Sequence, residues 1–164
     1  MDRQVQVQGR NHRAVISGRL AASGSKYSGK PDLIVRSGAG VIRKTATPKR
    51  VLIIEDNLDS VHALACLLTD MGHSVEYAIN GYAGLEVARR FRPAFVLLDL
   101  GLPGWDGFEV CRQIKKDPEL RGARVIAVTA FSQDEYVARS RAVGFELHLV
   151  KPVPVWLLEE LLGY

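Results

Sequence analysis

The chain has 164 residues, with 22 Lys and Arg against 18 Asp and Glu, a formal net charge of +4, and 47% hydrophobic residues. No run of about 18 apolar residues occurs, which excludes a transmembrane helix. The residues after Met1 do not form the continuous apolar stretch of a secretory signal, so we expect no signal peptide. Composition also excludes a disulfide scaffold, a collagen-like chain and a coiled coil. Cys66 and Cys111 lack metal-binding spacing, so we expect two buried thiols and a cytoplasmic protein.

Charge and hydrophobicity divide the chain near residue 50. Residues 1–50 carry 11 basic, 2 acidic and 17 apolar side chains, whereas residues 51–164 carry 11 basic, 16 acidic and 60 apolar ones. In the first segment, Gly, Ser or a charged residue interrupts every short apolar run before a period develops. We therefore predict a disordered basic tail over 1–48 and a folded domain over 50–164.

Three interpretations of the basic tail stay open. It is a solvated segment without a defined role, or it binds nucleic acid or anionic lipid by charge alone, or its start codon is assigned too early. Met1 is the only methionine before Met71, so the sequence does not settle whether the start codon is assigned too early. No recognition-helix pattern occurs in 1–50, so we expect no sequence-specific DNA binding.

The folded part begins with the apolar, β-branched run 51–54, which predicts a strand buried on both faces. A stripe of apolar residues at i, i+3, i+4 and i+7 from Val61 then predicts a helix that ends at Gly72. The alternation continues, with predicted strands at 74–79, 94–98, 124–128 and 146–150, and predicted helices at 82–92, around Phe108, Cys111 and Ile114, at 133–143 and at 154–162.

Five strands that alternate with five helices predict an α/β fold. Each crossover between parallel strands has to be right-handed and has to cover the sheet, so we expect a five-stranded parallel doubly wound sheet with helices on both faces. The expected strand order is the flavodoxin-like 2-1-3-4-5. In the last helix we expect Val155, Leu158, Leu161 and Leu162 to face inward.

Polar residues follow four of the predicted strands, at the edge where such sheets bind ligands. Glu55 and Asp56 follow the first strand, Asp99 the third, Thr129 the fourth and Lys151 the fifth. Three carboxylates that converge repel one another, and a hard divalent cation such as Mg²⁺ offsets that repulsion. A metal ion, a lysine, a hydroxyl donor and a carboxylate nucleophile are together the components of a phosphoryl-transfer site.

With these residues in this order, 51–164 resembles the receiver domain of two-component response regulators, of the chemotaxis-regulator-like type. The resemblance rests on the acid pair at 55–56, on Asp99 within 97–107, on Thr129-Ala130 and on Lys151-Pro152. It implies that Asp99 is the phosphorylated residue. It also implies that Mg²⁺ is held by the side chains of Asp56 and Asp99 and the Gly101 carbonyl, while Glu55 acts through bound water or completes the neutralisation of the ion.

The resemblance assigns roles to three further residues. Lys151, before a cis Pro152 peptide bond, pairs with Asp99 and later with the phosphoryl oxygens. Thr129 moves toward the phosphoryl group as a switch, and the Ala130 N–H donates to that group. Receivers usually have Tyr or Phe as a second switch three residues before the lysine, and here that residue is His148. Imidazole is smaller, polar and titratable, which puts the aromatic switch in doubt.

Two residues near the expected phosphorylation site predict a slow loss of phosphate. Gly101 and Phe131 stand two residues after Asp99 and Thr129, where receivers gate the access of water. A phenyl ring at residue 131 is expected to shield the acyl phosphate.

The sequence thus predicts a single-domain response regulator rather than an enzyme with a separate substrate. It would take a phosphoryl group from a sensor histidine kinase or a histidine phosphotransfer protein. It would then act by phosphorelay or through a partner that binds its 133–162 face. Whether the protein forms a homodimer stays open.

Two alternative functions remain. One is a receiver-like interaction module that is never phosphorylated, favoured by His148. The other is a Mg²⁺-dependent phosphohydrolase, opposed by Gly101, since such enzymes usually have a second acid there.

Overall fold

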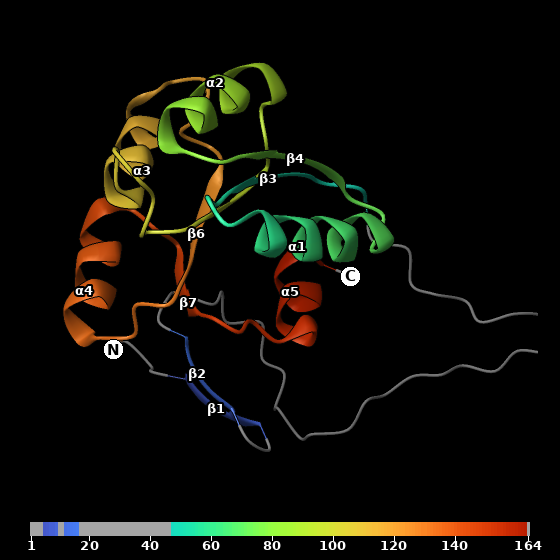
Figure 1. Cartoon of the computed structure of the whole chain (residues 1–164), viewed down its shortest axis with the longest axis vertical. Coiled ribbons are helices and arrows are strands. Elements are labelled where there is room, and N and C mark those ends of the chain that lie inside the picture. The colour runs from blue at the N-terminus through green and yellow to red at the C-terminus, as the bar shows by residue number, and fades with distance from the viewer. Residues whose placement is uncertain (1–4, 10–11, 17–46, 164) are drawn as a thin grey trace, which may run out of the picture.

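The computed structural model describes residues 5–9, 12–16 and 47–163 (Figure 1). Its main sheet is parallel and has the order β4-β3-β5-β6-β7. Counted along the chain within this sheet, the order is 2-1-3-4-5, so the predicted fold class is confirmed. The strands are β3 (Arg50–Ile54), β4 (Ser74–Ala78), β5 (Phe95–Leu98), β6 (Arg124–Thr129) and β7 (Leu147–Val150).

Five helices cover the two faces of the sheet, as Figure 1 shows. Helices α1 and α5 bury their apolar residues in one core, and α2 and α3 lie over the other together with residues of α4. The helices are α1 (Leu58–Asp70), α2 (Gly81–Phe91), α3 (Gly107–Lys116), α4 (Asp134–Val143) and α5 (Val155–Leu162). Within residues 47–163, no helix is both long enough and apolar enough to cross a membrane.

The central strand β3 shows why its sequence is apolar at every position after Arg50. Leu52 and Ile54 belong to the core under α2 and α3, whereas Val51 and Ile53 belong to the core under α1 and α5. Successive side chains of a strand point to opposite faces, and here both faces are covered. The strand therefore has no polar face, and its first polar side chains come where it ends.

Each of the first three helices begins with its own capping residue. Asn57 Oδ1 accepts a hydrogen bond from Ser60 N, Asn80 Oδ1 from Ala83 N and Asp106 Oδ1 from Glu109 N. Such caps satisfy N–H groups that lack a partner within the helix. The acids that directly follow β3 and β5 are therefore not needed as caps.

Several expectations about individual residues need correction. Val155 was expected inward but is 47% exposed, because it is the first residue of α5; the other three residues expected to face inward there are buried. Cys111 is buried as expected, whereas Cys66 is exposed on α1. His73 stands in the short loop after α1, a position that the sequence alone makes surface-prone, but the structure buries its side chain.

Residues 1–48 contain two short strands that the sequence patterns did not predict. They are β1 (Val5–Gly9) and β2 (His12–Ile16), which pair with each other in an antiparallel manner. Residues 1–4, 10–11 and 17–46 lie outside the described residues. The disordered tail and the boundaries 1–48 and 50–164 therefore stay predictions.

Candidate functional site

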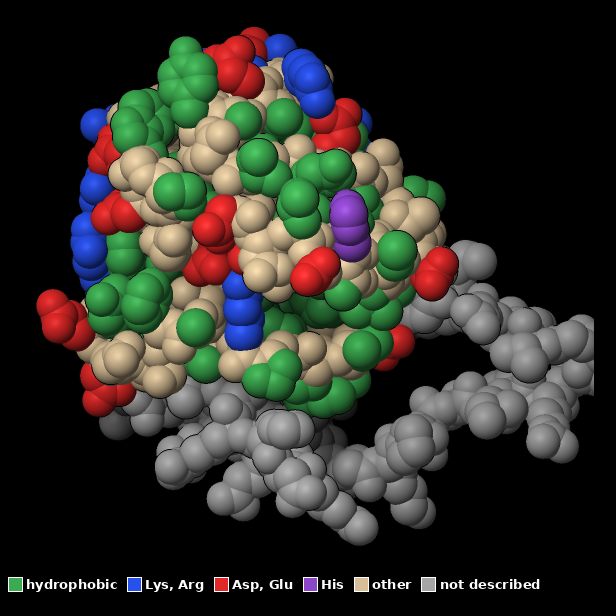
Figure 2. Space-filling model, viewed as in Figure 1, with side chains coloured by type: hydrophobic (Ala, Val, Ile, Leu, Met, Phe, Trp, Pro, Cys, Tyr) green, Lys and Arg blue, Asp and Glu red, His purple; other side chains and the backbone are tan. Residues whose placement is uncertain are grey.

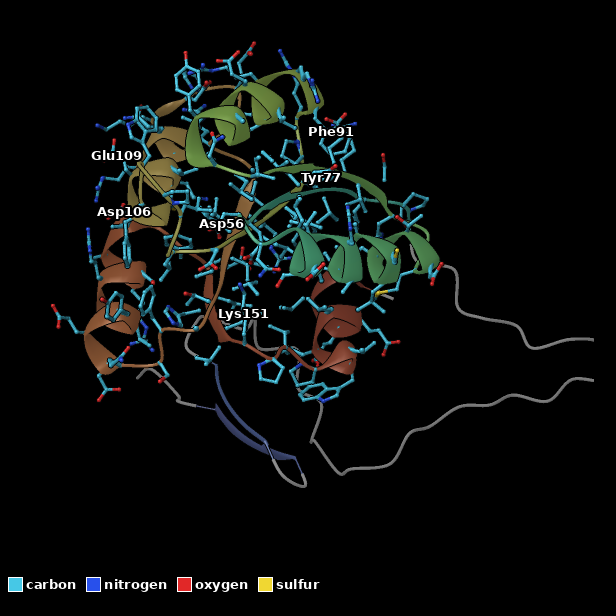
Figure 3. All side chains as sticks on the ribbon, in the orientation of Figure 1. Asp56, Tyr77, Phe91, Asp106, Glu109 and Lys151 are labelled. Atoms are coloured by element: carbon cyan, nitrogen blue, oxygen red, sulfur yellow. The ribbon has the colours of Figure 1, made fainter. Side chains whose placement is uncertain are left out.

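The side chains predicted for the site lie together at the carboxyl edge of the sheet. The main-chain hydrogen bonding of the sheet continues into them: Glu55 N donates to Ala78 O at 3.0 Å, Asp99 N to Ile54 O at 2.9 Å, and Lys151 N to Thr129 O at 2.8 Å. These residues are thus held by the rigid scaffold rather than by loops. Figure 3 shows Asp56 and Lys151, far apart in the sequence, near each other at this edge.

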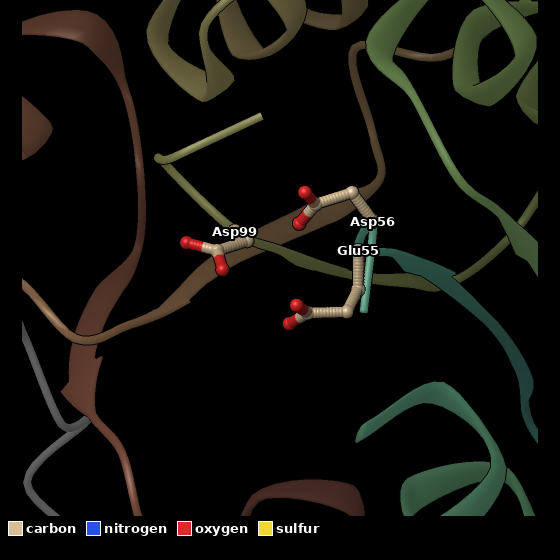
Figure 4. Close-up of side chains that lie close together, drawn as sticks. All are labelled: Glu55, Asp56 and Asp99. Carbon is tan, nitrogen blue, oxygen red and sulfur yellow. The ribbon is translucent and has the colours of Figure 1, made fainter. Parts of the chain in front are cut away.

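Three carboxylates converge at this edge. Figure 4 shows Glu55, Asp56 and Asp99 pointing toward one space, and one carboxylate oxygen from each lies within 4.8 Å of the other two. The three side chains differ in exposure: Glu55 is buried, Asp99 is partly buried and Asp56 is exposed. Within residues 47–163, the Asp56 carboxylate has no hydrogen-bond or ion-pair partner.

Lys151 supplies the positive charge opposite the acids. Its Nζ donates to Asp99 Oδ2 at 2.8 Å and also to Glu55 Oε2. The other Asp99 oxygen, Oδ1, accepts a hydrogen bond from Gly101 N at 3.0 Å. The Lys151–Pro152 peptide bond is cis, as expected from the resemblance. One ammonium group thus bridges the two carboxylates that are least exposed.

The electrostatics of the site separate Asp99 from Glu55. Burial raises the pKa of Asp99, but hydrogen bonds from Lys151, Gly101 N and Thr129 oppose this effect and hold that pKa below its usual value. Burial also raises the pKa of Glu55, and here the contact with Lys151 does not compensate, so the pKa stays above its usual value. Asp99 is therefore the carboxylate whose ionised form these contacts favour.

The raised pKa of Glu55 gives a prediction for stability. The folded protein binds a proton at Glu55 more tightly than the unfolded chain, so stability falls as pH rises through the interval from the usual pKa of 4.5 to the raised one. We expect Glu55→Gln, without divalent cations, to resist urea better than the parent at pH 7 and to lose this advantage toward pH 4.

The matched control for this experiment is Glu86→Gln, on the exposed face of α2, which is expected to leave the urea midpoint nearly unchanged. A Glu55→Gln protein that is less stable than the parent at pH 7 would show that the ion pair with Lys151 outweighs the burial of the charge.

The donor set fits a hard divalent cation. Carboxylate oxygens are the ligands that Mg²⁺ prefers, and Mg²⁺ commonly takes only one or two protein carboxylates and keeps bound water. The exposed, unpartnered carboxylate of Asp56 beside Asp99 meets that requirement. The residues present therefore fit the predicted Mg²⁺ site.

The site opens beside a groove of about 490 Å³ between α1 and α5. Its walls are mainly apolar and include Leu64, Leu67 and Val153, and Glu55, Asp99 and Lys151 also line it. In Figure 2, acidic and basic side chains lie next to a hollow with hydrophobic side chains near the middle of the visible face. A partner that reaches Asp99 would thus meet apolar surface nearby.

The comparisons with known proteins agree with this geometry. A family model described as the response regulator receiver domain matches residues 51–162. The chain belongs to the response regulator receiver family. The polar-differentiation response regulator DivK of Brucella anthropi is 39% identical over 108 residues, which is 66% of this chain and 88% of DivK.

Solved receiver structures are similar in fold. The receiver domain of a DNA-binding response regulator from Colwellia psychrerythraea has a TM-score of 0.66 and 32% identity, over 70% of this chain and 95% of that one. The receiver domain of a sensor histidine kinase from Pseudomonas aeruginosa has a TM-score of 0.66 and 26% identity, over 71% of this chain and 96% of that one. The latter was solved with a magnesium ion coordinated in its active-site cleft.

The remaining predicted residues of this receiver lie around the acids. Thr129 is fully buried at the end of β6, and Ala130 follows it at the surface. Gly101 is exposed and contacts Asp99 through its N–H. His148 is the exception, because it lies within β7 and hydrogen-bonds to Ser140 and to the Phe131 carbonyl, not to the acids.

Sequence reasoning missed Ser140. It is buried in the otherwise weakly amphipathic α4, one turn after the buried Val137. A buried hydroxyl requires a polar partner, but the weak amphipathic pattern of α4 does not show in the sequence that Ser140 faces inward. The partners of the Ser140 hydroxyl are the Tyr136 carbonyl, one turn earlier in α4, and His148, the residue that departs from the pattern of the family.

Proposed function

We propose that this receiver accepts a phosphoryl group on Asp99 in a Mg²⁺-dependent reaction. The donor is a phosphohistidine of a sensor histidine kinase or a histidine phosphotransfer protein, and the output is partner binding or phosphorelay. The observation that carries the proposal is the Lys151 ammonium group that bridges Asp99 and Glu55, with the free Asp56 carboxylate beside them. Membership of the receiver family supports it.

The residues of the site have complementary tasks in this reaction. An oxygen of the ionised Asp99 forms a bond to phosphorus while the P–N bond of the donor imidazole breaks in line. Lys151 then pairs with the phosphoryl oxygens, and the Thr129 hydroxyl and the Ala130 N–H donate to them. These donors stabilise the charge that spreads over the oxygens in the transition state.

The Mg²⁺ site uses the same acids. Asp56, Asp99 and the Gly101 carbonyl would hold the ion, with Glu55 acting through bound water. When bound, Mg²⁺ supplies positive charge to the phosphoryl oxygens. The magnesium bound by the similar receiver from Pseudomonas aeruginosa supports this assignment.

Magnesium is expected to stabilise the folded protein through Asp56. At a concentration ten times the dissociation constant, the gain in unfolding free energy is about 1.4 kcal/mol. We expect Mg²⁺ to raise the melting temperature of the parent but not that of Asp56→Asn. Asp59→Asn, an exposed acid in the first turn of α1, serves as control and should respond like the parent. An equal response of all three proteins would contradict the assignment of Asp56.

The proposed function is tested with Mg²⁺ and acetyl phosphate, followed by intact mass. A gain of one phosphoryl group that is absent in Asp99→Asn is the expected result. Mass that stays unchanged in the parent would indicate an interaction module that acts without phosphorylation. Repeated turnover of a phosphomonoester would indicate a phosphohydrolase instead.

A further inference from the structure

Both ring nitrogens of the buried His148 have hydrogen-bond partners. The ring is only 1% exposed, with Nε2 2.7 Å from the Phe131 carbonyl oxygen and Nδ1 2.9 Å from Ser140 Oγ. Because a carbonyl can only accept, Nε2 carries a proton and donates it to Phe131. Burial lowers the pKa of His148. Ser140 Oγ also lies 2.8 Å from the Tyr136 carbonyl oxygen, so its single hydroxyl proton serves either that carbonyl or His148 Nδ1.

The Phe131 residue is held at three points. Its carbonyl accepts from His148, its N–H donates to Thr129 Oγ1 at 3.4 Å, and its ring stacks on Tyr136 of α4 with centroids 4.5 Å apart and planes 7° from parallel. This fixes the segment between β6 and α4. The direction of the ring is therefore set by α4 and β7 together.

The ring of Phe131 lies close to the acceptor carboxylate. A Cβ placed on Gly101 would be 3.6 Å from Phe131 Cε2 and 3.8 Å from Asp99 Oδ1, so one position touches both groups. Residue 101 itself has no side chain to cover this side of Asp99. The edge of the Phe131 ring borders the same space.

We propose that His148 and Ser140 are positioning residues that hold the Phe131 ring beside the space next to Asp99 and so prolong the life of its phosphorylated form. The inference rests on the proposed function and concerns what happens after transfer. Hydrolysis forms a bond from a water oxygen to phosphorus, breaks the P–O bond to Asp99, and releases inorganic phosphate and a proton to solvent. A ring held beside the carboxylate limits the space for that water.

The double hydrogen bonding of His148 distinguishes it from a side chain that rotates freely. Turning the ring outward would take the donor away from the Phe131 carbonyl, which costs free energy, whereas the Ser140 hydroxyl would keep the Tyr136 carbonyl as its partner. His148 thus acts through Phe131 as a fixed clamp on the segment between β6 and α4.

The test compares phosphoryl half-lives after removal of the donor. His148→Met removes the donor to the Phe131 carbonyl at similar side-chain length. We expect a half-life about fivefold shorter, because the loss of one hydrogen bond shifts the segment between β6 and α4 by about that factor toward conformations in which Phe131 has moved away. His148→Gln keeps an N–H donor and should stay near the parent. Phe131→Ala should shorten the half-life at least as much as His148→Met.

A second variant keeps the test decisive if His148→Met does not fold. Ser140→Ala removes one oxygen from α4, and the half-life should again shorten. A half-life equal to the parent in Ser140→Ala and in folded His148→Met overturns the inference while the proposed function stands. A parent that gains no phosphoryl group at all overturns both, and is recognised before any half-life is measured.

Discussion

Replacement of Lys151 by methionine is expected to slow the phosphorylation of Asp99 by about 100- to 1000-fold, the usual cost of removing one charge-stabilising donor from a reaction centre. The Nζ of Lys151 contacts both Asp99 and Glu55, so the variant leaves the partly buried Asp99 and the buried Glu55 without their cation. The pKa of Asp99 should rise, because burial is then less opposed.

The rate of mass gain with acetyl phosphate and Mg²⁺ measures this effect. Lys116→Met is the control, since Lys116 is exposed in the last turn of α3, away from the acids. It should phosphorylate like the parent. If Lys151→Met were phosphorylated as fast as Lys116→Met, the charge of Lys151 would have no part in the transfer.

Gly107→Ala is expected to destabilise the fold by about 3 kcal/mol or more, at the upper end of the usual cost of overpacking. A Cβ at this first residue of α3 would lie 2.3 Å from the Asp99 carbonyl oxygen and 2.8 Å from Leu100 Cα. These are main-chain atoms, so no side-chain rotation relieves the clash. The backbone that carries Asp99 has to shift, and phosphorylation should slow as well.

Urea unfolding of Gly107→Ala and Gly122→Ala gives the comparison. A Cβ at Gly122 meets no atom within 4 Å, so that variant should stay within about 0.5 kcal/mol of the parent. Equal midpoints for the two variants would show that α3 can move away from β5 at little cost.

The sequence was sufficient for the sheet and for the acids because both depend on short-range patterns. The run at β3 is apolar at each position after Arg50, and Glu55 and Asp99 follow their strands directly, so the topology alone brings them to one edge. The strand order and the gathering of these acids could therefore be predicted.

The surroundings of His148 could not be predicted in the same way. Its partners come from α4 and from the segment before it, and both contacts depend on how α4 packs on the sheet. The weak amphipathic pattern of α4 gave no inward face to reason from. The prediction that Val155 faces inward was wrong for a related reason. Apolar periodicity does not indicate which residue in the first turn of a helix stays exposed to solvent.

The separate caps at Asn57 and Asp106 have an evolutionary consequence. Since the starts of α1 and α3 do not depend on Asp56 or Asp99, a single mutation can silence the chemistry while the shape that partners recognise survives. Descendants of such a chain can thus become signalling proteins that respond to binding alone, without first having to rebuild their architecture.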